Sequence, residues 1–344
     1  MQEKILTVIV PTYNMERYLD RCLSSLIVDN SSKMDSLEVI VVNDGSTDKS
    51  SEIAHSFESR YPETFKVMDK PNANYGSCIN VALPLARGKY VKILDADDFF
   101  DTQLFSKFIS ILMNCQADMV LTDMREVDIS GNAGASHSFE GILPEQKVIG
   151  LASYAKAMNG VGFYMQNVTY LTGKLVSAGY KQTEGISYTD QEWLFLPISL
   201  MESAEYYPVC LYNYLVGRTG QTVDMKVHRK NMWMEIEGTR VMLEEWEDMS
   251  GRIEDRDVFN FFYGRLLARI RTIYVMYLLK SSKYEGMQAL VSFDRYLSEK
   301  DSGLYEMAGA LNTAYGFPYV RKWREKYSTT NIVFAFIALK NKIS

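Results

Sequence analysis

The sequence predicts an α/β fold in which a mostly parallel sheet with Rossmann-like winding is flanked by helices and followed by an α-helical C-terminal extension. Short apolar runs rich in β-branched residues recur over the first 122 residues, as expected for strands buried on both faces. Segments with three- and four-residue apolar spacing separate these runs, as crossover helices do. Beyond His228 the pattern is helical almost to the end of the chain.

Strands and helices are expected to alternate in the first 125 residues. The strands are predicted at the apolar runs 5–10, 37–43, 65–68, 89–94 and 119–122. The helices are predicted at 16–27, from Ser46 or Thr47 to about Ser59, at 75–86 and at 102–114. This alternation specifies a parallel sheet whose strands all end at one edge.

The pattern changes after residue 125. Residues 126–150 are rich in Gly, Ser and polar groups and are expected to be irregular, up to a helix at 151–158. A helix capped by Thr189 is predicted to begin at Asp190 and to extend to Leu200. Residues 205–216 are expected to form a pair of strands, and further helices are predicted at 232–249, 258–280, 284–298 and 304–314. We therefore expect two domains, residues 1–225 and 226–344.

Composition excludes several classes of protein. A hydrophobic content of 47% with 23% charged residues is ordinary for a globular chain, and the net charge of −6 argues against a nucleic-acid partner. The four cysteines lie far apart without a CxxC pair, which fits reduced thiols in a cytoplasmic protein. The histidines His55, His137 and His228 lack the spacing of metal ligands. The apolar run 5–11 is too short for a signal peptide or a membrane span.

Residues 89–100, KYVKILDADDFF, run from a predicted strand directly into the carboxylates Asp95, Asp97 and Asp98. Ligands bind at the carboxyl edge of open α/β sheets, and crowded carboxylates there need a counter-charge. The simplest counter-charge is a hard divalent cation shared with a phosphate. The competing interpretation is a solvated turn before the helix that starts at Thr102.

Four segments in this order resemble the motifs of family 2 glycosyltransferases: VIVPTYN (8–14), VVNDGSTDKS (41–50), NYGSCINVALPLARGKYVKILDADD (74–98) and YTDQEW (188–193). The resemblance covers residues 5 to about 222. It implies a GT-A fold, a nucleotide-sugar donor, Mn²⁺ or Mg²⁺, and an inverting single displacement. Residues 1–125 would then be the nucleotide-binding half of the first domain, and residues 126–225 would face the acceptor.

The resemblance also implies donor-binding residues, namely Pro11, Thr12, Tyr13, Asp44, Asn74, Gly76 and Asp95, and one metal-binding residue, Asp97. Tyr13 would stack on uracil, and Asp44 would accept a hydrogen bond from the uracil imide. Asp95 is expected to contact the ribose, and Asp97 to hold the metal between the two donor phosphates. Gly76 would allow a close backbone approach, and Asn80 would face the site. The ordinary alternatives are core packing for Tyr13 and turn formation for Asp44.

Inverting transfer requires a base that takes the proton of the acceptor hydroxyl. The resemblance points to Asp190, although the usual family pattern is Glu-Asp where this chain has Thr189-Asp190. Glu192 is the second candidate, and the alternative for Asp190 is a helix cap. Arg218 and Gln221 follow a predicted strand on a Gly-flanked loop, which suits either a mobile clamp on the diphosphate or a simple surface loop.

The C-terminal tail, residues 318–344, carries basic residues around the apolar run 332–339. This run is too short to span a bilayer, so it either lies at the inner membrane face, packs on the catalytic domain, or forms an oligomer contact.

The resulting hypothesis is a non-processive enzyme, because the QxxRW signature and the membrane spans of processive synthases are missing. It would transfer sugar from a UDP-sugar to a glycan, lipid-linked or protein-linked acceptor in cell-surface polysaccharide or glycoconjugate synthesis. The alternatives are an inactive GT-A scaffold that serves as a binding or regulatory subunit, and a nucleotidyltransferase. The latter would normally carry a Gly-rich basic loop after the first strand, and PTYNMER is not one.

Overall fold

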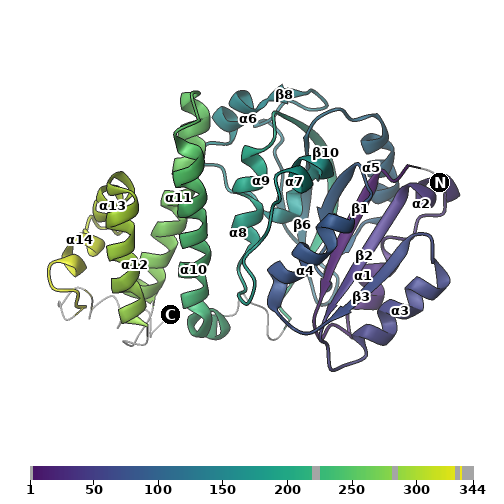
Figure 1. Ribbon diagram of the computed structural model, residues 1–344, viewed down its shortest axis with the longest axis horizontal. Coiled ribbons are helices and arrows are strands. Elements are labelled where there is room, and N and C mark those ends of the chain that lie inside the picture. The colour runs from purple at the N-terminus through teal and green to yellow at the C-terminus, as the bar shows by residue number, and fades with distance from the viewer. Residues whose placement is uncertain (1–2, 219–224, 281–285, 330–333, 335–344) are drawn as a thin grey trace. The chain divides into compact units, whose positions relative to one another are not determined.

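The structure, a computed structural model, describes residues 3–218, 225–280, 286–329 and 334 (Figure 1). The chain divides into two compact units, Met1–Thr219 and Gly220–Ser344. The first unit is built on a sheet flanked by helices, and the described part of the second unit is helical. The predicted fold class is therefore confirmed.

A single mixed sheet organises the first unit. The order of its strands in space is β3 (Phe65–Lys70), β2 (Leu37–Asp44), β1 (Leu6–Thr12), β4 (Tyr90–Ile93), β9 (Val168–Leu171), β6 (Met119–Asp128), β10 (Ser203–Val216) and β5 (Phe99–Phe100). Strands β3, β2, β1 and β4 are parallel, as are β6 and β10, whereas β9 runs against both β4 and β6. One edge of the sheet therefore holds the carboxyl ends of β1, β2, β4, β6 and β10, together with the start of the antiparallel strand β9.

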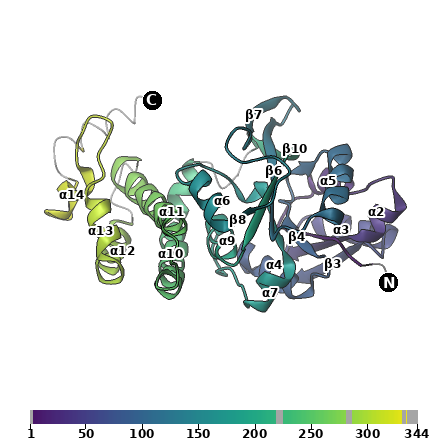
Figure 2. The same cartoon turned by 90° about the horizontal axis from the view of Figure 1, so that it is seen from above.

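Two short strands complete the sheet where the sequence predicted irregular structure. β7 (Ala133–His137) forms a hairpin with the end of β6, and β8 (Ile149–Gly150) pairs with β10. Figure 2 shows the β6–β7 hairpin extending from the rest of the sheet. The prediction for 126–150 was wrong in this respect because β7 is largely exposed and has no apolar alternation to mark it.

The predicted helices of the first unit are present, with shorter bounds in most cases. They are α1 (Leu19–Ser24), α3 (Ser50–Arg60), α4 (Asn74–Ala82), α5 (Thr102–Asn114) and α6 (Leu151–Met158). The last turn of the helix predicted at 75–86 is the 3-10 turn Leu83–Leu85, and α2 (Ser31–Ser36), α7 (Thr172–Ser177) and the 3-10 turn Met165–Asn167 were not predicted. The helix expected from Asp190 to Leu200 is instead two short helices, α8 (Asp190–Trp193) and α9 (Leu196–Ser199). Pro197 lies in the first turn of α9, where a missing N–H is tolerated.

Residues 205–216 do not form a pair of strands; they belong to the single 14-residue strand β10. Pro208 lies inside it, and the register with β6 shifts between Tyr207 and Cys210. Because proline cannot donate to the ladder, the strand accommodates it with a bulge rather than a turn.

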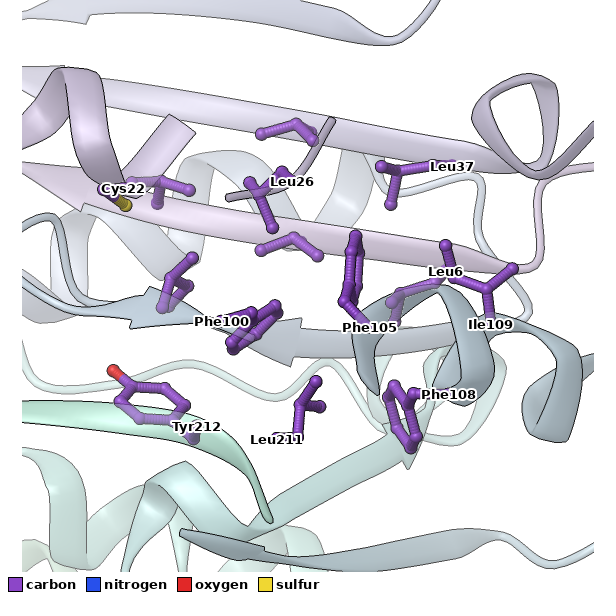
Figure 3. Close-up of a cluster of buried hydrophobic side chains, with 14 of the residues drawn as sticks. Leu6, Cys22, Leu26, Leu37, Phe100, Phe105, Phe108, Ile109, Leu211 and Tyr212 are labelled. Carbon is purple, nitrogen blue, oxygen red and sulfur yellow. The ribbon is translucent and has the colours of Figure 1, made fainter. Parts of the chain in front are cut away.

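The core of the first unit leads directly to the sheet edge at which the strands end. Figure 3 shows Phe100 and Phe105 between Leu26 on one side and Leu211 and Tyr212 on the other. The Phe100 ring centroid lies 5.1 Å from that of Phe105 and 5.6 Å from that of Tyr212. Tyr212 is fully buried, so its hydroxyl must find a partner within the protein.

The second unit consists of helices that pack on one another. They are α10 (Met225–Ser250), α11 (Arg256–Val275) with a π-helical continuation Met276–Lys280, α12 (Met287–Lys300), α13 (Ser302–Gly309) and α14 (Tyr319–Arg324). Asp255 caps α11 by accepting from the backbone N–H groups of Asp257 and Val258. The four predicted helices are confirmed, and α14 is additional.

The described part of the tail packs into the helical unit. Tyr319 and Trp323 of α14 are buried, and Arg324 pairs with the buried Asp294. The run 332–339, apart from the buried Phe334, lies outside the described residues, as does Gln221. In the part of the chain that the structure describes, none of the helices has the length and apolarity needed to cross a membrane.

Candidate functional site

The loops that follow β1 and β2 hold each other at the carboxyl edge of the sheet. The Asn14 backbone N–H donates to Ser46 Oγ at 3.0 Å, and the Thr47 backbone N–H donates to Asn14 Oδ1 at 2.8 Å. Asn14 adopts a φ of 54°, a left-handed conformation that asparagine tolerates. Pro11 and Thr12 are buried, whereas Tyr13 beside this junction is 48% exposed. Its ring is therefore accessible to a ligand at the edge where β1 ends.

Asp44, at the end of β2, is buried and bound to its own chain. Its Oδ1 forms an ion pair with Lys70 and accepts from the Ala73 backbone N–H at 3.0 Å. Lys70 Nζ also donates to Ser77 Oγ at 2.8 Å, so the pair connects β2, β3 and the first turn of α4. Asn74, with a φ of 67°, opens that helix at the same edge of the sheet. Lys70 had not been singled out in the sequence.

Asp95 lies just beyond β4 and is held by two neutral donors. The Tyr75 hydroxyl donates to its Oδ1 at 2.7 Å, and Gln166 Nε2 donates to its Oδ2 at 3.2 Å. Burial, followed by the negative charge of Asp97, raises the pKa of Asp95 to about 6. Two neutral side chains from different elements thus fix the carboxylate in place.

Asp97 and Asp98 have different environments. Asp98 is fully buried and accepts from the Tyr212 hydroxyl and the Leu215 backbone N–H, both at 2.7 Å. Burial, and then Asp97, raises the pKa of Asp98 well above its ordinary value. Asp97 is 7% exposed and forms an ion pair with Arg218, which follows β10. Asp98 therefore ties β4 to β10, whereas Asp97 has a cationic partner from a loop.

The segment 182–185 is fastened to α4. Asn80 exchanges hydrogen bonds with the Gln182 backbone, its Nδ2 donating at 2.9 Å and its Oδ1 accepting at 2.8 Å. A Cβ on Gly76 would lie 2.2 Å from the Thr183 carbonyl oxygen. Gly76 is thus required by this backbone contact, while Asn80 holds the segment. The sequence had suggested a close backbone approach for Gly76 and a site-facing position for Asn80.

The structure separates the two candidate bases. Glu192 is 1% exposed, and its Oε2 accepts from the Thr183 backbone N–H at 2.8 Å. Asp190 opens α8 directly after Tyr188 and Thr189; it is half-buried and accepts from Gln191 Nε2 at 3.3 Å. After burial and other contributions, the negative charge of Asp190 also raises the pKa of Tyr75 and of Asp95. Asp190 therefore lies near enough to Tyr75 and Asp95 to act on both electrostatically, and Glu192 supports the segment 182–185.

The described residues offer few side chains that could ligate a cation. Within the described ranges, no three His, Cys, Asp or Glu side chains gather as a metal site of protein ligands alone would require. Mg²⁺ is commonly held by one or two carboxylates together with the phosphates of a substrate. Asp97, next to Asp95 in the same turn, fits a cation that arrives with a diphosphate.

Comparison with known proteins identifies the first unit. The family model described as Glycosyl transferase family 2 matches residues 7–169. These residues are a family 2 glycosyltransferase domain. The match includes β1, β2 and the DADD turn with Asp95, Asp97 and Asp98, and it ends before Asp190 and Arg218.

The family 2 domain has relatives among curated proteins. It is 38% identical over 110 residues to an uncharacterized glycosyltransferase of Mycoplasma pneumoniae, a match that covers 31% of this chain and 36% of that protein. It is 31% identical over 159 residues to the glycosyltransferase GlyA of Streptococcus pneumoniae, which covers 46% of this chain and 21% of GlyA. The chain thus spans little more than a third of the length of these relatives, or less.

The fold is shared with solved structures. Residues 1–349 of TarS from S. aureus superpose with a TM-score of 0.61 at 20% identity, covering 87% of this chain and 82% of that one. The chain therefore has the GT-A fold. At the edge of its sheet the structure gathers the predicted residues Pro11, Thr12, Tyr13, Asp44, Asn74, Asp95, Asp97 and Arg218, and the charge of Asp190 acts on Asp95.

Sequence reasoning missed several residues of the site. They are Lys70, Tyr75, Lys92, Gln166 and Tyr212. Tyr75 lies inside a recognised motif, so its place beside the site could have been inferred. Gln166 and Tyr212 follow Asp95 by 71 and 117 residues and carry no local signal.

Proposed function

We propose that this chain transfers a sugar from a UDP-sugar to a hydroxyl group of an acceptor, with inversion at the anomeric carbon and with a divalent cation. The observation that carries the proposal is the position of Asp95, Asp97 and Asp190. At the carboxyl edge of the sheet, the charges of Asp97 and Asp190 both act on Asp95, and Arg218 pairs with Asp97.

Proteins of similar fold support a nucleotide-sugar donor. TarS has been solved with UDP-GlcNAc. The mannosyltransferase PcManGT from Pyrobaculum calidifontis, with a TM-score of 0.50 and 18% identity, has been solved with GDP-Man and Mn²⁺. In this chain the half-exposed Tyr13 ring would stack on the base, and Asp44 would accept a hydrogen bond from the edge of the base. Asp95 would contact the ribose. Asn74 would line the same pocket from the start of α4.

Asp97 would hold the cation, Mn²⁺ or Mg²⁺, together with the donor phosphates. When bound, the cation supplies positive charge that stabilises the departing diphosphate. Arg218 adds a guanidinium beside Asp97, and such a group binds phosphate oxygens in a bidentate manner. The pairing of Arg218 with Asp97 keeps this guanidinium at the site rather than in solvent.

Asp190 would act as the base. The acceptor oxygen attacks C1 of the donor sugar and forms the new glycosidic bond, while its proton passes to the Asp190 carboxylate. The bond from C1 to the diphosphate oxygen breaks, and the electron pair leaves with the nucleoside diphosphate. Attack from the face opposite the leaving group inverts the configuration at C1. The buried Glu192 would hold the segment that carries Asp190 rather than take the proton.

We further propose that the acceptor is a glycan, a lipid-linked or a protein-linked molecule of cell-surface polysaccharide or glycoconjugate synthesis, and that transfer is non-processive and cytoplasmic. The catalytic region would be residues 1–225, with residues 226–344 as a helical region. Contact of the tail with the inner membrane face or with a second copy belongs to the same proposal.

Donor turnover tests the function. Wild-type protein is incubated with a panel of UDP- and GDP-sugars, Mn²⁺ or Mg²⁺, and candidate acceptors, and release of nucleoside diphosphate is measured. We expect release from at least one UDP-sugar, a product with inverted configuration by NMR, and loss of both in Asp190→Asn. Asp20→Asn, on the exposed face of α1, is the control. Nucleotide binding without release under every condition would instead support the inactive scaffold.

A further inference from the structure

We propose that Lys92 is a positioning residue that sets the orientation of Asp95 through Gln166. This inference rests on the proposed function only where it concerns the donor nucleotide. Lys92 lies in the middle of β4, three residues before Asp95, and is 0% exposed. An aliphatic side chain would be the ordinary choice at such a position, because a buried ammonium group is costly to desolvate.

The Lys92 side chain donates hydrogen bonds to two backbone carbonyl groups. Its Nζ donates to the carbonyl oxygen of Gln166 at 2.7 Å and to that of Val168 at 3.1 Å. Burial lowers the pKa of Lys92 to about 7, and burial is the only cause of this shift. The ammonium group is therefore held by peptide dipoles from one short segment.

The sheet explains why a long donor is needed at this point. β4 and β9 pair only at Tyr90 with Leu171 and at Val91 with Tyr170. Toward the carboxyl end of β4, β9 is no longer paired with it, although Val168 still pairs with Leu121 of β6. On the β4 side, the backbone of residues 166–168 therefore needs another link. Lys92 provides this link from the β4 side.

The same turn is fixed from the β6 side. Asn167 Nδ2 donates to the Thr122 carbonyl oxygen at 2.9 Å, and the Tyr164 backbone N–H donates to Asn167 Oδ1 at 3.0 Å. With Lys92 on the opposite side, the 3-10 turn Met165–Asn167 is clamped between β4 and β6. From this turn the Gln166 side chain, 8% exposed, reaches Asp95 just beyond the end of β4.

Gln166 transmits this constraint to Asp95. Its Nε2 donates to Asp95 Oδ2 at 3.2 Å, opposite the Tyr75 hydroxyl on Oδ1. Both oxygens of Asp95 are thus oriented, one from α4 and one from the turn that Lys92 holds. If Lys92 only satisfied two carbonyls, its loss would affect stability but would leave Asp95 and nucleotide binding unchanged.

The test compares Lys92 with a second lysine that also donates to two backbone carbonyls. Lys92→Met removes the donor at similar length, and Gln166→Met removes only the amide that contacts Asp95. Lys4→Met is the control, because Lys4 also donates to two backbone carbonyls, of Leu37 at 2.7 Å and of Glu63 at 2.9 Å, at the opposite edge of the sheet. The affinity for UDP with Mn²⁺ is measured by calorimetry, and crystal structures of the two site variants are determined.

We expect Lys92→Met and Gln166→Met each to weaken UDP binding about tenfold, and Lys4→Met to leave it unchanged. The double variant should bind no more weakly than Lys92→Met alone, because both changes interrupt one connection. In the Lys92→Met crystal structure, the Gln166 amide should have moved away from Asp95.

An amide still bonded to Asp95 in that structure, or additive losses in the double variant, would overturn the inference. If Lys92→Met does not fold, Lys92→Gln takes its place, since it keeps a donor that is too short to reach both carbonyls. If the wild-type protein binds no nucleoside diphosphate, the proposed function fails, and the crystal structure still decides the role of Lys92.

Discussion

In the helical unit, Asp294 is fully buried and its charge is met by a complete set of donors. Arg324 pairs with it at 2.8 Å, and the hydroxyls of Tyr274 and Tyr327 donate to it. In the α/β unit, Asp95, Asp97 and Asp98 lie within four residues and have one paired arginine, Arg218, besides neutral donors. The helical unit thus provides Asp294 with both a cationic partner and neutral donors, whereas the group in the α/β unit contains more carboxyl groups than paired cations.

This difference separates a structural site from a candidate functional one. Buried charges that are paired and fully bonded fix the geometry of a fold, whereas a buried excess of one sign is unfavourable unless a ligand offsets it. Substitution of a carboxylate should therefore have opposite consequences in the two places: loss of activity at the sheet edge, and loss of stability in the helical unit.

The largest effect is expected for Asp97→Asn. Transfer should fall about a thousandfold, because the proposed cation and the diphosphate lose their carboxylate ligand. The melting temperature should change little, because relief of the repulsion with Asp95 and Asp98 offsets the loss of the ion pair with Arg218. Initial rates of nucleoside diphosphate release and calorimetric melting curves provide the two readouts. A rate within tenfold of the wild type would remove Asp97 from the site.

Asp294→Asn should give the reverse result. The variant leaves the Arg324 guanidinium, whose side chain is 12% exposed, without a counter-charge. We expect the free energy of unfolding of the helical unit to fall by about 3 kcal/mol. Urea denaturation followed by fluorescence measures it, with Glu299→Gln on the exposed face of α12 as the control. Equal stability of the two variants would show that Asp294 is not part of a closed network.

Tyr212→Phe tests whether Asp98 is a structural or a functional carboxylate. Tyr212 donates to Asp98 Oδ2 at 2.7 Å and accepts from the Asp95 backbone N–H at 3.1 Å, so the change should act on stability. We expect a loss of about 1–2 kcal/mol in the free energy of unfolding, with the KM for the donor changed less than twofold. A large change in KM with unaltered stability would instead place Asp98 among the functional carboxylates.

The smallest effect is expected for the exposed His55, which bonds to two carboxylates. Hydrogen bonds from His55 to Asp69 at 2.7 Å and to Glu58 at 2.9 Å raise the pKa of His55 above its usual 6.5. This stabilisation is fully present below the unfolded pKa and is lost as pH rises through the higher folded value. The side chain is 46% exposed, so solvent screens the interaction. Melting temperatures of the wild type and His55→Gln should differ at pH 5.5 and converge at pH 8.5; a constant difference would contradict this.

Local sequence patterns were sufficient for the parallel part of the sheet. Apolar runs such as residues 5–10 and 37–43 are buried along their whole length, so hydrophobicity and strand position coincide. The end of β4 was identified for the same reason, because Asp95 follows a run that only a buried strand explains. The helix α5 was predicted with its bounds, since its apolar spacing starts directly after the Asp101 cap.

Other features depend on contacts that no local pattern records. β9 is a four-residue strand whose burial follows from its place between β4 and β6. Lys92 interrupts an apolar run, and only the position of residues 166–168 explains why a lysine stands there. The different roles of Asp190 and Glu192 likewise could be recognised only from the contact between Glu192 and Thr183. Both carboxylates are candidate bases by sequence, and the structure shows that their surroundings differ.

The most direct test of the central claim is the coupling between cation and nucleotide binding. The affinity for UDP, and for GDP as a comparison, is measured by calorimetry with and without Mn²⁺ in the wild type and in Asp97→Asn. We predict that Mn²⁺ strengthens UDP binding at least tenfold in the wild type and has no effect in Asp97→Asn. Equal strengthening in both proteins, or none in the wild type, would contradict the assignment of the carboxylate cluster to a cation and a donor diphosphate.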